Sequence, residues 1–394
     1  MTYKNSTELM QLSGVPIYMN DLAEACLRGR LNLFLQGDTG SGKTQLAQDM
    51  TKYFPDKSLF VLGRNDMDTR ELFQRINLEK YRTASSTDEL RELTDKVNYN
   101  LIIVDELPNC VPAVRAQLFN LFDGFVEING KAYPIGNGYS VGIATGNIGQ
   151  KFTESSNELG RALKDRMHVI VDTDYFAPKP SDTLEILTNS TNPRVEFNQT
   201  TKATKNLIKE HQKLTSREIP LEKLVLANYL VHGLDYCSKG SKRKMKDTWP
   251  TQLESHEQGS DVGLILPVST RAAKSVIRLS EALDDVVKEK NPTVELDYFD
   301  SMMQAFKFVS AYSGILNPSA VQANYNNDFY KALDAVILTT KTQYEEQKEA
   351  VTSGIEMAYE GKKESKILNE FTGRWEFMRD ILNSISETTK QSKS

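Results

Sequence analysis

A glycine-rich run near the start of the chain, QGDTGSGKTQ, holds the residue types that bind phosphate. Gly37, Gly42, Lys43 and Thr44 fit the pattern G-x-x-x-x-G-K-[ST], and Gly40 adds a further flexible position. In such a loop the glycines let backbone N–H groups turn onto phosphate oxygens, and the helix that follows adds its partial positive charge. Lys43 would reach the β- and γ-phosphates, while the Thr44 hydroxyl would bind Mg²⁺. The run therefore predicts a site for a nucleoside triphosphate.

A second group with suitable chemistry is the pair Asp105 and Glu106, which ends the apolar run in LIIVDELPN. An aspartate at a strand end can hold the Mg²⁺ shell, and a neighbouring glutamate can orient and deprotonate the attacking water. On its own a strand ending in Asp-Glu is more often a solvated turn, but beside a phosphate loop it predicts a catalytic pair. The glutamate favours hydrolysis over transfer to a small substrate. The absence of an N-K-x-D run gives no support to guanine.

Four further side chains are candidates to complete a triphosphate site. Asn147 follows the apolar run VGIAT, where its amide could hold the attacking water, although a turn-capping asparagine is the alternative. Arg161 and Arg166 precede another apolar run, and Arg271 begins a helical pattern much later in the chain. An arginine fork binds two phosphate oxygens at once, but most arginines lie on the surface for other reasons.

The elements that must position these groups alternate between strands and helices over residues 1–174. Five short apolar runs are expected to form strands buried on both faces: 31–36, 59–62, 101–104, 141–145 and 169–171. Helical patterns lie between them, which predicts a parallel sheet with helices on both faces. Within this region FVEINGKAYPI carries Asn129-Gly130, the strongest short-range signal for a β-hairpin.

From residue 178 onward helical patterns dominate, as in LEKLVLANYLVHGL and STRAAKSVIRLSEALDDVV. Near the end, six apolar residues spaced three and four apart predict one amphipathic helix: Leu368, Phe371, Trp375, Met378, Leu382 and Ile385. We therefore expect an αβα core over residues 1–174, a helical lid with inserted loops over 175–317, and a helical C-terminal extension over 318–394.

The composition of the chain excludes several classes of protein. Its 394 residues are 39% apolar and 26% charged, and the net charge of −5 gives no general attraction to nucleic acid or anionic lipid. The three cysteines lie far apart and form no C-x-x-C pair, so neither a zinc site nor a disulfide framework is indicated. No signal pattern and no apolar stretch of membrane-spanning length is found, so we expect a cytoplasmic protein that does not insert into membranes.

The motifs together resemble those of a known family. The ordered set GDTGSGKT, LIIVDELPN, EINGK, IATGN, LGRALKDRM and LPVSTRAA is similar to the MoxR group of AAA+ ATPases, over roughly residues 20–300. This resemblance implies an α/β fold with an AAA+ αβα core, a mainly parallel five-stranded sheet and an all-α lid. It also implies that the glycine-rich loop is Walker A, that Asp105 and Glu106 are Walker B, and that Asn147 is sensor 1.

The resemblance also assigns roles to the arginines. Arg166 matches the finger that reaches the γ-phosphate of a neighbouring subunit, and Arg271 matches the sensor 2 arginine on the lid. Two departures concern this assignment: ATGNI stands where the family has ATQNP, and Met167 replaces the common phenylalanine. Arg161 is a rival for the finger. The residues expected to bind the nucleotide are Gly37, Asp38, Thr39, Gly40, Ser41, Gly42, Lys43, Thr44, Gln45 and Asp105. Thr44 and Asp105 are also the expected Mg²⁺ ligands.

The function that the resemblance implies is ATP hydrolysis with Mg²⁺ by a homo-oligomeric ring, expected to be a hexamer, that remodels or assembles protein partners like a chaperone. Family members often act with a partner that carries a von Willebrand factor A domain. A rival function is a nucleic-acid motor or loader, for which the basic run 239–246 is the local support, although such runs are usually solvated loops. A third is an assembly or structural protein with slow ATPase activity, whose helical tail docks a scaffold.

Overall fold

The computed structural model describes residues 7–64, 72–77, 79, 83, 91–128, 130–147, 166–176, 179–188, 202–234, 263–361 and 365–393. The chain forms two compact units. Unit 1 comprises Met1–Arg217 and Glu281–Leu296, and unit 2 comprises Glu218–Ser280 and Asp297–Ser394. These units divide the chain by internal packing, so the three predicted functional ranges 1–174, 175–317 and 318–394 stay a prediction.

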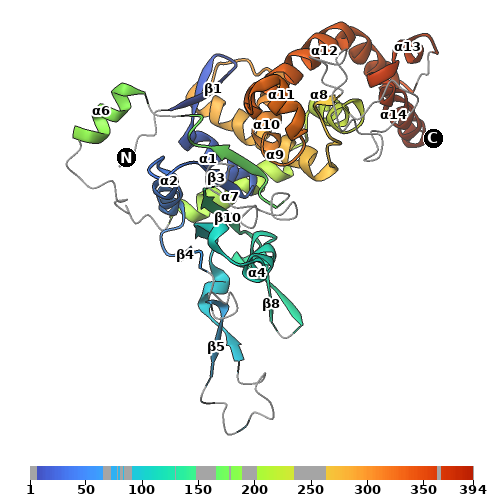
Figure 1. The fold of residues 1–394 in the computed structure, drawn as a ribbon. Coiled ribbons are helices and arrows are strands. Elements are labelled where there is room, and N and C mark those ends of the chain that lie inside the picture. Colours follow the sequence, from blue (N-terminus) through green and yellow to red (C-terminus); the bar gives the residue numbers. More distant parts are fainter. Residues whose placement is uncertain are drawn as a thin grey trace. The chain divides into compact units, whose positions relative to one another are not determined.

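Unit 1 is built around a parallel sheet of five strands, in the order β11-β3-β10-β7-β4 (Figure 1). The strands are β3 (Leu33–Gln36), β4 (Ser58–Leu62), β7 (Leu101–Asp105), β10 (Val141–Gly146) and β11 (Val169–Asp172). Every residue of the three central strands is buried, because both faces of the sheet are covered. The predicted α/β class and all five predicted strands are confirmed.

The described residues of unit 1 also form helices of several lengths. They are α1 (Met19–Gly29), α2 (Lys43–Asp49), α4 (Pro112–Phe122), α6 (Pro180–Thr188) and α7 (Lys202–Ser216). A short 3-10 turn, Met50–Tyr53, extends α2. The long helix α9 (Thr270–Lys290) begins in unit 2 and ends in unit 1. The helix α7 was not singled out by the sequence patterns.

The described residues of unit 1 also form three β-hairpins outside the main sheet. They are β1–β2 (Glu8–Leu12 and Val15–Tyr18), β5–β6 (Gln74–Ile76 and Arg91–Leu93) and β8–β9 (Phe125–Ile128 and Lys131–Pro134). Figure 1 shows that β5 and β8 both extend away from the sheet. The predicted hairpin is confirmed as β8–β9, with Gly130 at a φ of 72° in its turn, while Asn129 lies outside the described residues. The other two hairpins carried no comparable turn signal.

Unit 2 is helical, as the patterns after residue 178 predicted. Its elements are α8 (Leu221–Asn228), a π-helical turn (Tyr229–Gly233), the first part of α9, α10 (Tyr298–Ser310), α11 (Pro318–Tyr325), α12 (Phe329–Tyr359), α13 (Ser365–Glu370), a 3-10 turn (Gly373–Trp375) and α14 (Phe377–Lys393). Among the described residues of this unit, Ile265 and Leu316 form an isolated antiparallel β-bridge.

The prediction of one amphipathic helix near the C-terminus was wrong. The helix α13 ends at Glu370, and α14 begins at Phe377 after a turn that contains Gly373 at a φ of 58°. Phe371 and Trp375 are nevertheless buried, as the spacing indicated. The apolar spacing runs on across the break because both helices and the turn bury side chains in unit 2. Burial was therefore predicted correctly, and helix continuity was not.

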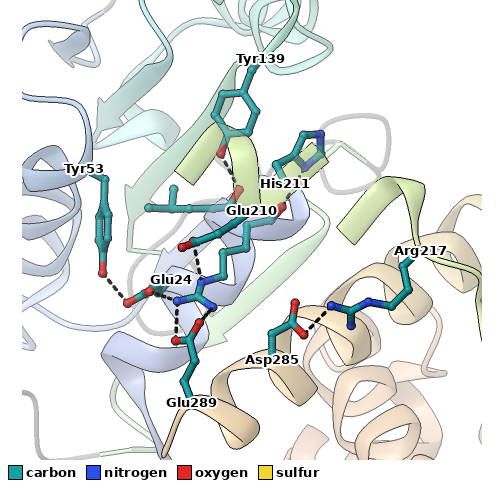
Figure 2. Close-up of polar contacts among 10 residues, drawn as sticks. Glu24, Tyr53, Tyr139, Glu210, His211, Arg217, Asp285 and Glu289 are labelled. Carbon is teal, nitrogen blue, oxygen red and sulfur yellow. Dashed lines mark hydrogen bonds and ion pairs between the residues drawn. The ribbon is translucent and has the colours of Figure 1, made fainter. Parts of the chain in front are cut away.

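Unit 1 also buries an arginine among three carboxylates. The Arg28 guanidinium contacts Glu24 at 2.5 Å and Glu289 at 2.6 and 2.8 Å, and it lies 3.5 Å from Glu210 (Figure 2). The Tyr53 hydroxyl donates to Glu24 from the turn after α2. Burial raises the pKa of Glu210, and Arg28 opposes this rise. The cluster ties the end of α9 to α1 and α7.

Candidate functional site

The glycine-rich loop joins β3 to α2, and its backbone requires glycine. Gly37, Gly40 and Gly42 have φ values of 151°, 88° and 84°, which side chains other than glycine rarely tolerate. At Gly37 an added Cβ would also lie 2.2 Å from Thr173 Oγ1. The loop then turns directly into α2, whose first residue is Lys43. The sequence pattern thus forms the strand, loop and helix that a phosphate site needs.

Lys43 folds back over its own loop. Its ammonium group donates to the carbonyl oxygens of Gly37 at 2.9 Å and Asp38 at 2.7 Å, and it lies 3.3 Å from Ser41 Oγ. The residue is 6% exposed. A buried ammonium held by neutral oxygens can exchange them for phosphate oxygens, which form stronger, charge-assisted hydrogen bonds.

A short segment after β11 holds the loop in place. Thr173 Oγ1 lies 2.9 Å from the Gln36 carbonyl oxygen and 2.8 Å from Ser41 Oγ. Asp174 Oδ2 accepts from the Asp38 backbone N–H at 2.7 Å. Sequence reasoning missed these two residues. No local sequence signal marks them, because their contacts follow from the pairing of β11 with β3 in the folded sheet.

The two candidate metal ligands, Thr44 and Asp105, lie in direct contact. The Thr44 hydroxyl donates to Asp105 Oδ1 at 2.8 Å, although the two residues belong to different elements, α2 and β7. Asp105 is 9% exposed. Mg²⁺ prefers oxygen ligands and usually keeps several waters, binding through one or two carboxylates together with substrate phosphates. A hydroxyl and one carboxylate beside a phosphate loop fit that requirement. Among the described residues, no group of three or more His, Cys, Asp or Glu side chains could hold a metal.

Glu106 follows Asp105 in a left-handed backbone conformation, with φ 56° and ψ 44°. Its backbone N–H donates to Thr145 Oγ1 at 3.1 Å, and Thr145 Oγ1 donates to Asp105 Oδ1 at 2.5 Å. Gly63, after β4, packs against this turn: its N–H donates to the Asp105 carbonyl oxygen at 2.7 Å. Sequence reasoning missed both Thr145 and Gly63.

Asn147 lies one residue beyond the end of β10, which pairs with both β3 and β7. Because the carboxyl ends of parallel strands share one edge of a sheet, Asn147, Asp105 and the glycine-rich loop lie at the same edge. The Asn147 Oδ1 atom is buried and finds no hydrogen-bond partner in the described part of the chain. A buried, unsatisfied amide oxygen at this position can accept a hydrogen bond from a water molecule.

Arg166 lies at the opposite edge of the sheet, where the amino ends of β3 and β11 meet. Its carbonyl oxygen accepts from Asn32 Nδ2 at 2.9 Å, and Asn32 directly precedes β3. The strands β3 and β11 each have four residues and span about 13 Å, so Arg166 and the glycine-rich loop are not brought together within one chain. The guanidinium contacts Asp123 at 2.8 Å and lies 4.9 Å from the centre of the Phe119 ring.

The remaining candidates are less constrained. Arg271 is the second residue of α9 and is exposed within unit 2, so its place beside the nucleotide stays a prediction. Arg161 lies outside the described residues. Gln45 donates to Asp49 Oδ1 at 2.9 Å within α2, and burial raises the pKa of Asp49.

Comparison with known protein families accounts for this arrangement. The model of the AAA domain, dynein-related subfamily, matches residues 32–167. That range begins before β3 and ends after Arg166, so it contains the loop, the acidic pair and Asn147. Residues 32–167 form an AAA+ domain. No curated protein matches the chain.

The solved structures that match this chain include the following two. A proposed ATPase from Cytophaga hutchinsonii is 18% identical, with a TM-score of 0.56 over 80% of this chain and 88% of that one. This likeness shows the fold. A full-length MCM homolog from Methanopyrus kandleri is 13% identical and covers 75% of this chain and 55% of that one, with a TM-score of 0.45 that is too low to carry an argument. None of the described helices combines the length and apolar character needed to span a bilayer.

Proposed function

We propose that the AAA+ domain hydrolyses ATP with Mg²⁺, and that the chain works as a MoxR-type homo-oligomeric ring that remodels or assembles protein partners. The observation that carries the hydrolysis is the set of hydrogen bonds beside the glycine-rich loop, in which Thr44 and Thr145 donate to Asp105 and the Glu106 backbone N–H donates to Thr145. Groups that hold a metal, accept a proton and bind phosphate then lie at one edge of one sheet.

The binding part of the proposal assigns the phosphates to the loop. Backbone N–H groups from Gly37 to Gln45 would bind the β- and γ-phosphates, and Lys43 would move from its carbonyl partners onto their oxygens. Thr44 and Asp105 would hold Mg²⁺, which supplies neutralisation of the phosphate charge. The orientation of Thr44 toward Asp105 supports this pairing.

The chemical part assigns the proton to Glu106. A water oxygen would attack the γ-phosphorus. The bond between the γ-phosphorus and the β–γ bridging oxygen would break, and ADP would leave with that bridging oxygen. Glu106 would accept the proton of the water, and the unsatisfied Asn147 amide would hold that water in place. Hydrolysis therefore needs no covalent intermediate on the protein.

The assembly part rests on the arginines. Since Arg166 lies at the edge opposite to the loop, it would act on the site of a neighbouring subunit, as the family resemblance implies. Arg271 would act as sensor 2 on its own subunit. The basic run 239–246, which supported a nucleic-acid motor, lies outside the described residues. A von Willebrand factor A partner, a hexamer and a cytoplasmic location stay predictions.

The test of the proposal is nucleotide binding and turnover by the purified chain. Lys43→Ala should abolish ATP binding, because it removes the ammonium that neutralises the phosphates. Glu106→Gln should bind ATP and fail to hydrolyse it, because an amide cannot accept the proton. Glu349→Gln, an exposed position on α12, is the matched control and should behave as wild type.

Three outcomes would contradict the proposal. Turnover by Glu106→Gln at the wild-type rate would remove Glu106 as the base. A rate that rises only when DNA is added would favour the nucleic-acid motor, and a slow rate that no protein or DNA stimulates would favour the assembly protein.

A further inference from the structure

We infer that Thr145 is a positioning residue for hydrolysis. From the neighbouring strand β10 it holds the side chain of Asp105 and the backbone of Glu106 in place. Gly63, after the strand β4 on the other side of β7, makes room for the same turn. The inference rests on the proposed function. It adds two residues to which the motifs assign no role, Thr145 within IATGN and Gly63 outside the motifs, and both act through Asp105 and Glu106.

The direction of the two Thr145 hydrogen bonds follows from the chemistry of their partners. An ionised carboxylate can only accept, and a backbone N–H can only donate. The Thr145 hydroxyl must therefore donate its single proton to Asp105 Oδ1, at 2.5 Å, and accept from the Glu106 N–H, at 3.1 Å. The residue has no exposed surface, so water cannot replace either bond. One hydroxyl thus fixes the Asp105 side chain and the Glu106 backbone together.

The Glu106 backbone needs such support because its left-handed conformation is unusual for a residue with a side chain. The Asn109 N–H donates to the Glu106 carbonyl oxygen at 2.9 Å, which fixes the other end of the turn. On the β4 side, a Cβ added to Gly63 would lie 2.6 Å from the Glu106 carbonyl oxygen and 3.0 Å from that of Asp105. A small residue at 63 and a hydroxyl at 145 therefore hold the turn from both flanking strands.

The shared acceptor has a consequence for the metal site. Thr44 and Thr145 both donate to the same oxygen, Asp105 Oδ1. Without the Thr145 hydroxyl, the bond to Thr44 is the one that the Asp105 carboxylate keeps among the described residues, so the carboxylate can rotate. Nucleotide held by the loop alone should be little affected. The additional affinity gained from Mg²⁺ and the rate of hydrolysis should both fall.

The experiment compares Thr145→Val, which removes the hydroxyl and keeps the shape, with Thr145→Ser, which restores the hydroxyl. Thr145→Val should lower kcat by roughly tenfold to a hundredfold, the effect expected for losing a hydrogen bond to a charged group. It should also reduce the gain in ATP affinity on adding Mg²⁺, measured with a fluorescent ATP analogue. Thr145→Ser should recover most of both quantities.

Thr340→Val is the matched control, because Thr340 is 1% exposed and its hydroxyl has no hydrogen-bond partner among the described residues. It should leave kcat and the Mg²⁺ effect unchanged. If Thr145→Val does not fold, Gly63→Ala reports on the same turn from the opposite strand. Its Cβ should lower kcat while ATP binding is retained.

The inference is overturned if Thr145→Val keeps the wild-type kcat and Mg²⁺ effect, or if Thr145→Ser is as impaired as Thr145→Val. An active Glu106→Gln variant, or a wild-type chain without ATPase activity, would instead contradict the proposed function. In those cases the Mg²⁺-dependent gain in ATP affinity still decides the inference, since it requires no hydrolysis.

Discussion

At the scale of single residues, Arg28 faces more negative charge than it can neutralise. Glu24, Glu210 and Glu289 all lie within 3.5 Å of its guanidinium, and Lys213 acts on Glu210 from the same helix. One guanidinium can compensate one carboxylate fully, so the cluster keeps excess negative charge when all three are ionised. Glu210 is the most distant of the three and carries part of that excess.

The pH dependence of stability should reveal this charge. Burial raises the pKa of Glu210, Arg28 lowers it, and Glu289 and Glu24 raise it. A carboxyl group whose pKa is raised by folding stabilises the folded state when the pH is below the ordinary pKa of the group. That stabilisation is lost as the pH rises through the raised pKa. The Tm of Glu210→Gln minus that of wild type should therefore increase between about pH 4 and pH 7.

Thermal unfolding of both proteins over that range is the measurement, with Glu349→Gln as the control for losing an exposed carboxylate. A difference in Tm that stays constant with pH, or falls, would mean that folding does not raise the pKa of Glu210.

Sequence reasoning located part of the site and missed the rest for a definite reason. Lys43, Thr44 and Asp105 were found because phosphate and magnesium chemistry requires those residue types at a recognisable spacing. Thr145 and Thr173 were missed because their contacts depend on which strands are neighbours in the sheet. That order is a property of the fold, and local sequence does not display it.

At the scale of elements, the π-helical turn Tyr229–Gly233 leaves no space for a side chain at its last residue. A Cβ on Gly233 would lie 2.6 Å from the Tyr229 ring and 3.0 Å from the Arg374 carbonyl oxygen. The Tyr229 ring cannot move away easily, because it is fully buried and its hydroxyl donates to Gln343 at 2.7 Å. The ring also packs 4.8 Å from Trp375, centre to centre.

Gly233→Ala should therefore destabilise unit 2 by about 1–3 kcal/mol, the usual cost of overpacking a core. Denaturant unfolding followed by tryptophan fluorescence measures this change, since Trp375 lies in the same cluster. Ser353→Ala, an exposed change on α12, should have almost no effect. Equal stability of Gly233→Ala and wild type would show that the turn can open to accept a methyl group.

The elements of unit 1 were easier to predict than those of unit 2. Strands buried on both faces appear as continuous apolar runs, so β3, β7 and β10 could be recognised without knowledge of their partners. The C-terminal helices follow no such rule. Their apolar spacing reports which residues are buried, and it continues through Gly373, where the backbone leaves the helical conformation.

At the scale of the whole molecule, the separation of Arg166 from the glycine-rich loop predicts that one chain cannot hydrolyse ATP efficiently alone. Chains with Glu106→Gln keep an intact arginine, and chains with Arg166→Ala keep an intact base. Mixing the two should restore turnover, because some interfaces then combine both intact groups. An arginine finger contributes on the order of a thousandfold, so partial rescue should be measurable.

The matched control is a mixture of Glu106→Gln with Lys43→Ala, which should stay inactive because both changes affect the same side of the interface. Arg161→Ala in place of Arg166→Ala tests the rival finger. Failure of every mixture, together with a wild-type rate per chain that does not depend on concentration, would rule out a shared site.

The placement of Arg166 and the loop at opposite edges also gives each subunit two unlike faces. Under the proposed assembly, subunits join head to tail, so an open chain always ends in one loop without an arginine and one arginine without a loop. Such a chain holds one complete site fewer than its number of subunits. Closing the ring joins the two incomplete ends and creates the last site, so the turnover per subunit would itself report whether the assembly is open or closed.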